Sequence, residues 1–127
     1  MGTSMLLIAD DPAWRFSAES VIAAATRLWP TADVRPVPSE VYSHQVAIAA
    51  RTLTVRIGPK LVSMQTSLDL NDCGRLAFEV VQGLPPMTRA HYLDSGNGHA
   101  LLVDPSTPLA TYFTILDAPP LSREEGD

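Results

Sequence analysis

The sequence has little cysteine, little positive charge and no long apolar run, and each scarcity excludes a class of protein. A single cysteine, Cys73, cannot form an internal disulfide, so we expect a reducing compartment, the cytoplasm, rather than a disulfide-rich secreted scaffold. Nine Lys and Arg stand against 14 Asp and Glu, for a net charge of -5. Because phosphate binding rests on clustered basic residues, this balance argues against nucleic acid and favours a basic protein partner.

No apolar stretch reaches the length of a membrane span. Residues 5–9 are apolar but end at Asp10 and Asp11, which predicts a short strand. Residues 1–4 are interpreted as a leader or a cloning remnant, and residues 119–127 as an acidic, disordered tail. The remaining residues, 5–118, suffice for one domain with a single core, since 46% of the chain is hydrophobic.

Helical spacing of apolar residues is clearest between Asp69 and Gly83. Asp69 is the expected cap, and Gly83 the expected left-handed stop before two prolines. A second helix is predicted from Ser17 to Trp29, where Pro30 prevents continuation. Residues 109–116 fit a short C-terminal helix, with a strand as the alternative, because helical spacing and beta-favouring residues coincide there.

Short runs with beta-type alternation occupy much of the remaining chain. They lie at residues 5–9, 44–50, 52–57, 61–66, 89–93 and 99–103. Residues 32–37 are extended as well, but Pro36 and Pro38 confine that piece to an edge or a linker. The pattern predicts a two-layer α+β fold with a mainly antiparallel sheet of five or six strands. The two main helices are expected on one face of that sheet.

Only one constellation of side chains suggests chemistry. His91, Asp94 and His99 flank a predicted hairpin, and two imidazoles with a carboxylate can hold zinc with a position left for water. If Leu93 pairs with His99 across a five-residue loop, His91 and His99 share a face. A metal-dependent or small-ligand enzyme is therefore the alternative hypothesis, and a structural role as polar strand residues is the simpler interpretation.

No residue is assigned to catalysis, to a cofactor or to a metal. The Gly-x-Ser-x-Gly pattern of a nucleophile elbow is absent, and Gly96 to Gly98 lacks the helix and the third glycine of a dinucleotide loop. Candidate surface residues for a partner are His91, Asp94 and His99, together with the aromatic residues Trp14 and Tyr42. For Trp14 a place at the core edge is the competing interpretation.

Four short segments suggest a resemblance. They are Trp14-Arg15-Phe16, Trp29-Pro30 before a valine-containing strand, Leu93-Asp94, and Pro105-Ser106-Thr107 before the last element. In these the chain resembles a group of small actinobacterial α+β proteins, and some bacterial proteins of this shape are immunity proteins or secretion-associated chaperones. The missing catalytic pattern and the acidic charge, together with this resemblance, favour a non-enzymatic protein-binding module of immunity, chaperone or adaptor type. Its partner would be a toxin or a secreted effector, and a homodimer is a further expectation.

Overall fold

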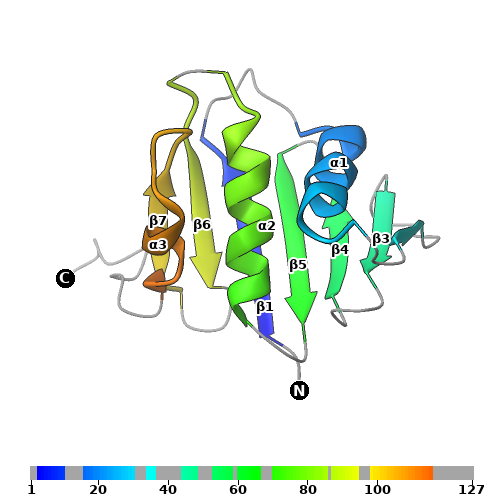
Figure 1. Cartoon of the computed structure of the whole chain (residues 1–127). Helices are drawn as coiled ribbons and strands as arrows, with labels where there is room; N and C mark the ends of the chain where they lie inside the picture. The colour runs from blue at the N-terminus through cyan, green and yellow to red at the C-terminus, as the bar shows by residue number, and fades with distance from the viewer. Residues whose placement is uncertain are drawn as a thin grey trace.

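A computed structural model of the chain describes residues 3–10, 16–30, 34–36, 44–48, 53–58, 60–66, 70–85, 87–94 and 98–115. Within these residues, three helices cover one face of a seven-stranded antiparallel sheet (Figure 1). The elements are β1 (Thr3–Ala9), α1 (Ala18–Leu28), β2 (Val34–Pro36), β3 (His44–Ile48), β4 (Leu53–Ile57), β5 (Leu61–Thr66), α2 (Leu70–Gln82), β6 (Ala90–Asp94), β7 (Ala100–Val103) and α3 (Leu109–Tyr112). The predicted α+β class is confirmed. Among the described helices, none has the length and apolar character needed to cross a bilayer.

The first strand lies inside the sheet, because the strand order is β2-β3-β4-β5-β1-β6-β7. β1 pairs antiparallel with both β5 and β6. Since β5 and β6 both run opposite to β1, they run parallel to each other, and a tight hairpin cannot join parallel strands. α2 makes the crossover between them, and Figure 1 shows this helix lying over β1.

β1 determines which face of its neighbours is buried. Met5 and Leu7 point toward the helices and are fully buried, whereas Leu6 and Ile8 are only partly buried, as the two-residue period of a strand requires. Directly paired residues share a face, so the residues opposite Met5 and Leu7 are buried too: Met64, Val62, Asp94 and Tyr92. Each large apolar side chain buried in this way contributes about 1.5–3 kcal/mol relative to exposure.

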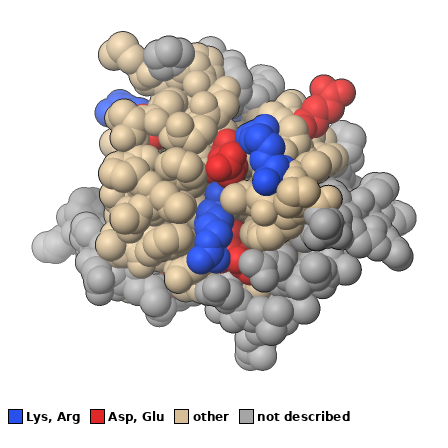
Figure 2. Space-filling view, viewed as in Figure 1, with Lys and Arg blue, Asp and Glu red and all other residues tan. Residues whose placement is uncertain are grey.

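α1 has a capped start and an ion pair to α2. The Oγ of Ser17 accepts a hydrogen bond from the N–H of Ser20 at 3.1 Å, which satisfies an amide that the first turn leaves unpaired. Near the other end, Arg27 Nε lies 3.1 Å from Glu79 Oε1. Figure 2 shows blue and red atoms together where the two helices meet, on a mostly tan face. This pair is partly exposed and contributes about 0–1 kcal/mol, so burial of the apolar faces holds the helices.

The sheet in the described residues has seven strands, where five or six were predicted. The additional strand is β2, which pairs with β3 from Val34 to Pro36. Pro36 has no N–H to donate, and an edge strand tolerates that loss because one side of its backbone has no strand to pair with. Of the two predicted alternatives for this segment, an edge strand or a linker, residues 34–36 form the edge strand.

The N-terminal strand is longer than predicted. Thr3 and Ser4 belong to β1 and pair with Thr66 and Gln65 of β5. These two residues were left out of the predicted strand, and they extend it because β5 is long enough to pair with them. The predicted tail, residues 119–127, lies outside the described residues.

The end of α2 also differs from its prediction. Gly83 and Leu84 donate their N–H groups to carbonyls three residues back, so the last turn tightens and Gly83 does not adopt a left-handed conformation. Positive φ occurs instead at Met87, where φ is 72°. There the N–H of Thr88 donates to the Pro85 carbonyl at 3.1 Å, which makes Met87 the third residue of a four-residue turn. A type II turn requires positive φ at that position.

The C-terminal segment forms a short helix, α3, as predicted for residues 109–116 in preference to a strand; residues 109–115 of it are described. The Tyr112 ring lies 5.7 Å from the Phe78 ring and 5.6 Å from the Tyr92 ring, measured between centroids. A Cβ at Gly74 would lie 3.5 Å from Tyr112 Cβ, an ordinary van der Waals distance, so α3 packs directly against α2 at this position. These ring contacts attach α3 to the core.

The buried hydroxyl of Tyr112 has no hydrogen-bond partner among the described residues. Burial raises the pKa of Tyr112, so the group stays neutral, but a buried polar group without a partner still costs about 1–3 kcal/mol. We expect Tyr112→Phe, which keeps the ring, to raise the free energy of unfolding by about 1 kcal/mol in urea titrations. Tyr112→Leu loses the ring contacts as well and should lower it. A loss of stability in Tyr112→Phe would contradict this account.

Candidate functional site

The β6–β7 hairpin does not bring the predicted metal ligands together. Leu93 pairs with Ala100, and the N–H of Asp94 donates to the His99 carbonyl at 2.8 Å. Asp94 therefore lies opposite His99, one residue away from the predicted pairing, and a shift of one residue exchanges the faces of a strand. His99 shares the face of Asp94, whereas His91 lies on the opposite face. In the described parts of the chain, no three His, Cys, Asp or Glu residues are grouped as metal ligands.

The surface candidates have different environments. Asp94 is 3% exposed on the helix-covered face, so its prediction as a surface residue is wrong: the observed register turns it inward. His99 is partly buried. Trp14 and Tyr42 lie outside the described residues.

His91 belongs to a small charged group on the sheet. His91 Nε2 lies 3.3 Å from Asp10 Oδ1, and an Arg89 guanidinium nitrogen lies 3.5 Å from Asp10 Oδ2. The N–H of Asp10 also donates to the Arg89 carbonyl at 3.0 Å, continuing the β1–β6 ladder. Asp10, which ends the apolar run of residues 5–9, thus pairs with a neighbouring strand. The Asp10 carboxylate is thus shared between the Arg89 guanidinium and the His91 ring.

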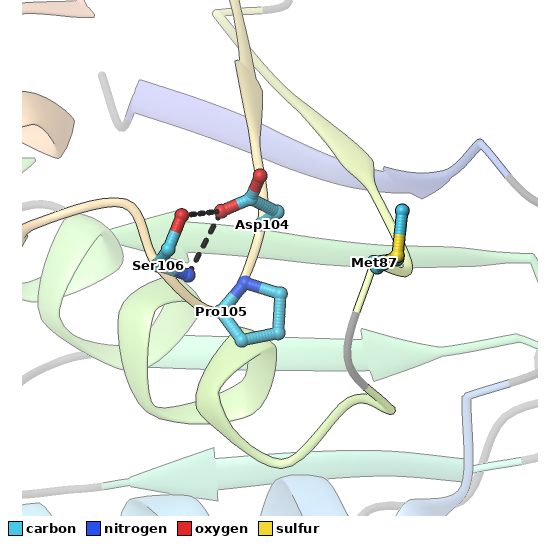
Figure 3. Close-up of a pocket in the computed structure, with 4 residues that line it drawn as sticks. All are labelled: Met87, Asp104, Pro105 and Ser106. Carbon is cyan, nitrogen blue, oxygen red and sulfur yellow. Dashed lines mark hydrogen bonds between the residues drawn. The ribbon is translucent and has the colours of Figure 1, made fainter.

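A surface hollow of about 370 Å³ lies between two turns near the end of α2. Met87 from the α2–β6 turn lines one side, and Asp104, Pro105 and Ser106 from the β7–α3 turn line the other (Figure 3). Gln82, the last residue of α2, donates from Nε2 to the Pro105 carbonyl at 2.7 Å. This bond attaches the β7–α3 turn to the end of α2, the helix that leads into the α2–β6 turn. The distance between the two turns is therefore fixed.

Met87 is held away from the core by its turn. Its side chain is 90% exposed, the most exposed of the large described hydrophobic side chains. Among the described non-glycine residues it alone has positive φ. Such a conformation costs an unbranched residue on the order of 1 kcal/mol, and strained positions of this kind cluster at functional sites. The turn thus presents an apolar, flexible side chain beside the hollow.

Asp104 is ordered by its own turn. Its Oδ1 accepts hydrogen bonds from the Ser106 N–H at 2.8 Å and the Ser106 hydroxyl at 2.5 Å. Its backbone N–H donates to Thr107 Oγ1 at 2.9 Å, and its carbonyl accepts from the Thr107 N–H at 2.9 Å. The hydrogen bonds from Ser106, followed by those involving Thr107, lower the pKa of Asp104. The carboxylate is therefore ionised at neutral pH and fixed in direction.

The lining of the hollow places a carboxylate oxygen beside two apolar side chains. In Figure 3 both dashed lines reach one oxygen of Asp104, and the other oxygen points away from Ser106. That oxygen can accept from a cationic group, while Met87 and Pro105 can contact an aliphatic stem, as in a lysine or arginine side chain. Among the described residues that line the hollow there is no histidine, so the Ser106 hydroxyl has no imidazole to activate it there.

Sequence reasoning did not identify this hollow. The segment Asp104-Pro105-Ser106-Thr107 has the composition of a side-chain-bonded turn, and Pro85-Pro86-Met87 that of a reversal, so both turns were recognisable. Their proximity was not, because it depends on where β7 ends relative to α2. The described residues define an α+β protein whose hollow joins an apolar wall to an ionised carboxylate. No protein-family model, no curated protein and no solved structure matches the chain.

The hydrogen bonds that Asp104 accepts predict how its pKa responds to substitution. Ser106→Ala removes the hydroxyl donor and keeps the backbone donor, so the pKa of Asp104 should rise toward its ordinary value of 3.8. Because folding depresses this pKa, the associated stability is present above the unfolded-state pKa and is lost as the pH falls through the folded-state pKa. Carboxyl-carbon NMR against pH measures the change. Ser20→Ala, a distant hydroxyl deletion, should leave the Asp104 titration unchanged, and an unshifted curve for Ser106→Ala would oppose the assignment.

Proposed function

We propose that the chain is a non-enzymatic protein-binding module that receives a basic side chain of its partner in the hollow beside Asp104. The observation that supports this most directly is the combination of an ordered, ionised carboxylate with a Met87 side chain that is 90% exposed. A lysine or arginine side chain has an aliphatic stem that can contact Met87 and a cationic end that can reach the Asp104 carboxylate. Methionine is also common at surfaces that adapt to partners, because its thioether chain is flexible and polarizable.

The charge of the chain supports the same partner chemistry. A net charge of -5 attracts a basic protein over a distance of roughly a Debye length, about 8–10 Å at physiological salt, which raises the association rate. A toxin, a secreted effector or another client with a basic segment fits this proposal, and so do the roles of immunity protein, chaperone or adaptor. The proposed location is the cytoplasm.

The metal-dependent hairpin enzyme has no comparable support. His91 and His99 lie on opposite faces of the hairpin sheet, and Asp94 is buried beneath the helices. A shared ion would require a different register. We therefore propose binding alone.

Affinity capture tests the proposal. Wild-type chain, Asp104→Asn, Met87→Ser and the matched control Glu19→Gln, an exposed acid on α1, are used as baits in lysate of the source cell. We expect wild type and Glu19→Gln to capture a basic protein in stoichiometric amount. Asp104→Asn and Met87→Ser should not capture it. Its affinity for Asp104→Asn should fall about tenfold or more, the order expected for one lost charge-assisted hydrogen bond.

Two results would contradict the proposal. One is equal capture of the same partner by wild type and Asp104→Asn, which would place the contact elsewhere. The other is turnover of a substrate by the purified chain that Asp104→Asn abolishes, which would make the hollow a catalytic site.

A further inference from the structure

The two edges of the described sheet are not equivalent. β2 forms one edge, and its Arg35 and Pro36 are residue types that protect an edge against pairing with another sheet. β7 forms the other edge, and its sequence, Ala-Leu-Leu-Val, contains neither charge nor proline. Leu102 in this strand is 50% exposed. β7 thus lacks the residues that normally prevent edge-to-edge association.

The hairpin register determines which backbone groups face outward from β7. Asp94 and His99 form a hydrogen-bonded pair, and such pairs alternate along an antiparallel ladder. Leu101, opposite Tyr92, therefore directs its N–H and carbonyl toward β6. Ala100 and Leu102 direct theirs away from β6, toward the edge. No described strand pairs with that side.

We propose that β7 pairs antiparallel with β7 of a second copy of this chain, with Leu102 opposite Leu102 at the twofold axis. A twofold contact requires a surface that complements itself, and an antiparallel strand pair centred on one outward-facing residue satisfies this condition. Each Leu102 N–H donates to the Leu102 carbonyl of the other copy. The sheet becomes continuous across both chains, and the helices of both copies lie on the same side.

Charge favours a second copy at this edge rather than elsewhere on the surface. Two chains that each carry a net charge of -5 repel one another, but pairing centred on Leu102 places the uncharged Leu101, Leu102 and Val103 of the two copies opposite one another. Ala100 of each copy then lies opposite Asp104 of the other. The Leu102 side chains then cover each other on the sheet face that carries no described helix. Residues 116–127 of the same chain are poorly suited to pair with the β7 edge, because they include Pro119, Pro120 and three acidic residues after them.

Cysteine crosslinking tests the register. A hydrogen-bonded antiparallel pair places its Cα atoms about 5.5 Å apart, within the range of a disulfide. We expect Leu102→Cys to form a disulfide-linked dimer under mild oxidation. Ile22→Cys, at an exposed apolar position on α1, should not, and neither should wild type, whose Cys73 is fully buried. Absence of the crosslink in Leu102→Cys, or equal crosslinking in Ile22→Cys, would overturn the proposal.

Proline substitution tests the edge itself. The N–H of Leu102 faces outward, so Leu102→Pro should keep the monomer folded while removing the hydrogen bonds across the axis. By sedimentation, wild type should have twice the 13.7 kDa of one chain, and Leu102→Pro should dissociate at least roughly tenfold more readily. Leu102→Lys, which places a charge at the axis and keeps the N–H, should dissociate as well. A monomeric wild type, or a dimer unaffected by Leu102→Lys, overturns the proposal.

Discussion

The hydrogen bond from the Asp94 N–H to the His99 carbonyl sets the register of the β6–β7 hairpin, and the features of functional interest follow from it. With this register His99 shares the face of Asp94, and His91 and His99 lie on opposite faces. The same register directs the Leu102 backbone outward, and β7 ends where the Pro105 carbonyl can accept from Gln82, the last residue of α2. One residue of slippage would reverse all of these orientations together.

The position of β1 supports this hairpin from the other side. β1 pairs with both β5 and β6, so it holds these two strands on either side of itself, and α2 crosses over it. The fully buried Met5 and Leu7 of β1 lie beneath the helices. α2 then ends at Gln82, whose side chain bonds the Pro105 carbonyl. A chain of backbone and side-chain contacts thus leads from the centre of the sheet to the acidic hollow. Binding and assembly, as proposed, use different parts of this sheet edge: the hollow for a basic partner and the strand for a second copy.

Local patterns predicted most of the elements and little of their arrangement. The spacing of Leu76, Val80 and their neighbours was sufficient for α2, because that signal acts within a few residues. Pro36 narrowed its segment only to an edge strand or a linker, and the structure shows the edge strand. The central position of β1 was not predictable, since nothing local tells an apolar strand which partners it will have. The positive φ expected at Gly83 occurs at Met87, in the turn that the Thr88 N–H closes onto the Pro85 carbonyl. The hollow was missed since it joins residues that only tertiary contacts bring together.

The register of β6 and β7 is directly measurable by NMR. In an antiparallel ladder the alpha protons of residues in non-hydrogen-bonded pairs lie closest, with Cα atoms about 4.5 Å apart. The structure requires strong contacts between the alpha protons of Leu93 and Ala100 and of His91 and Leu102. A pattern that instead pairs Leu93 with His99 would return His91 and His99 to one face. It would contradict the account of both the hollow and the strand edge.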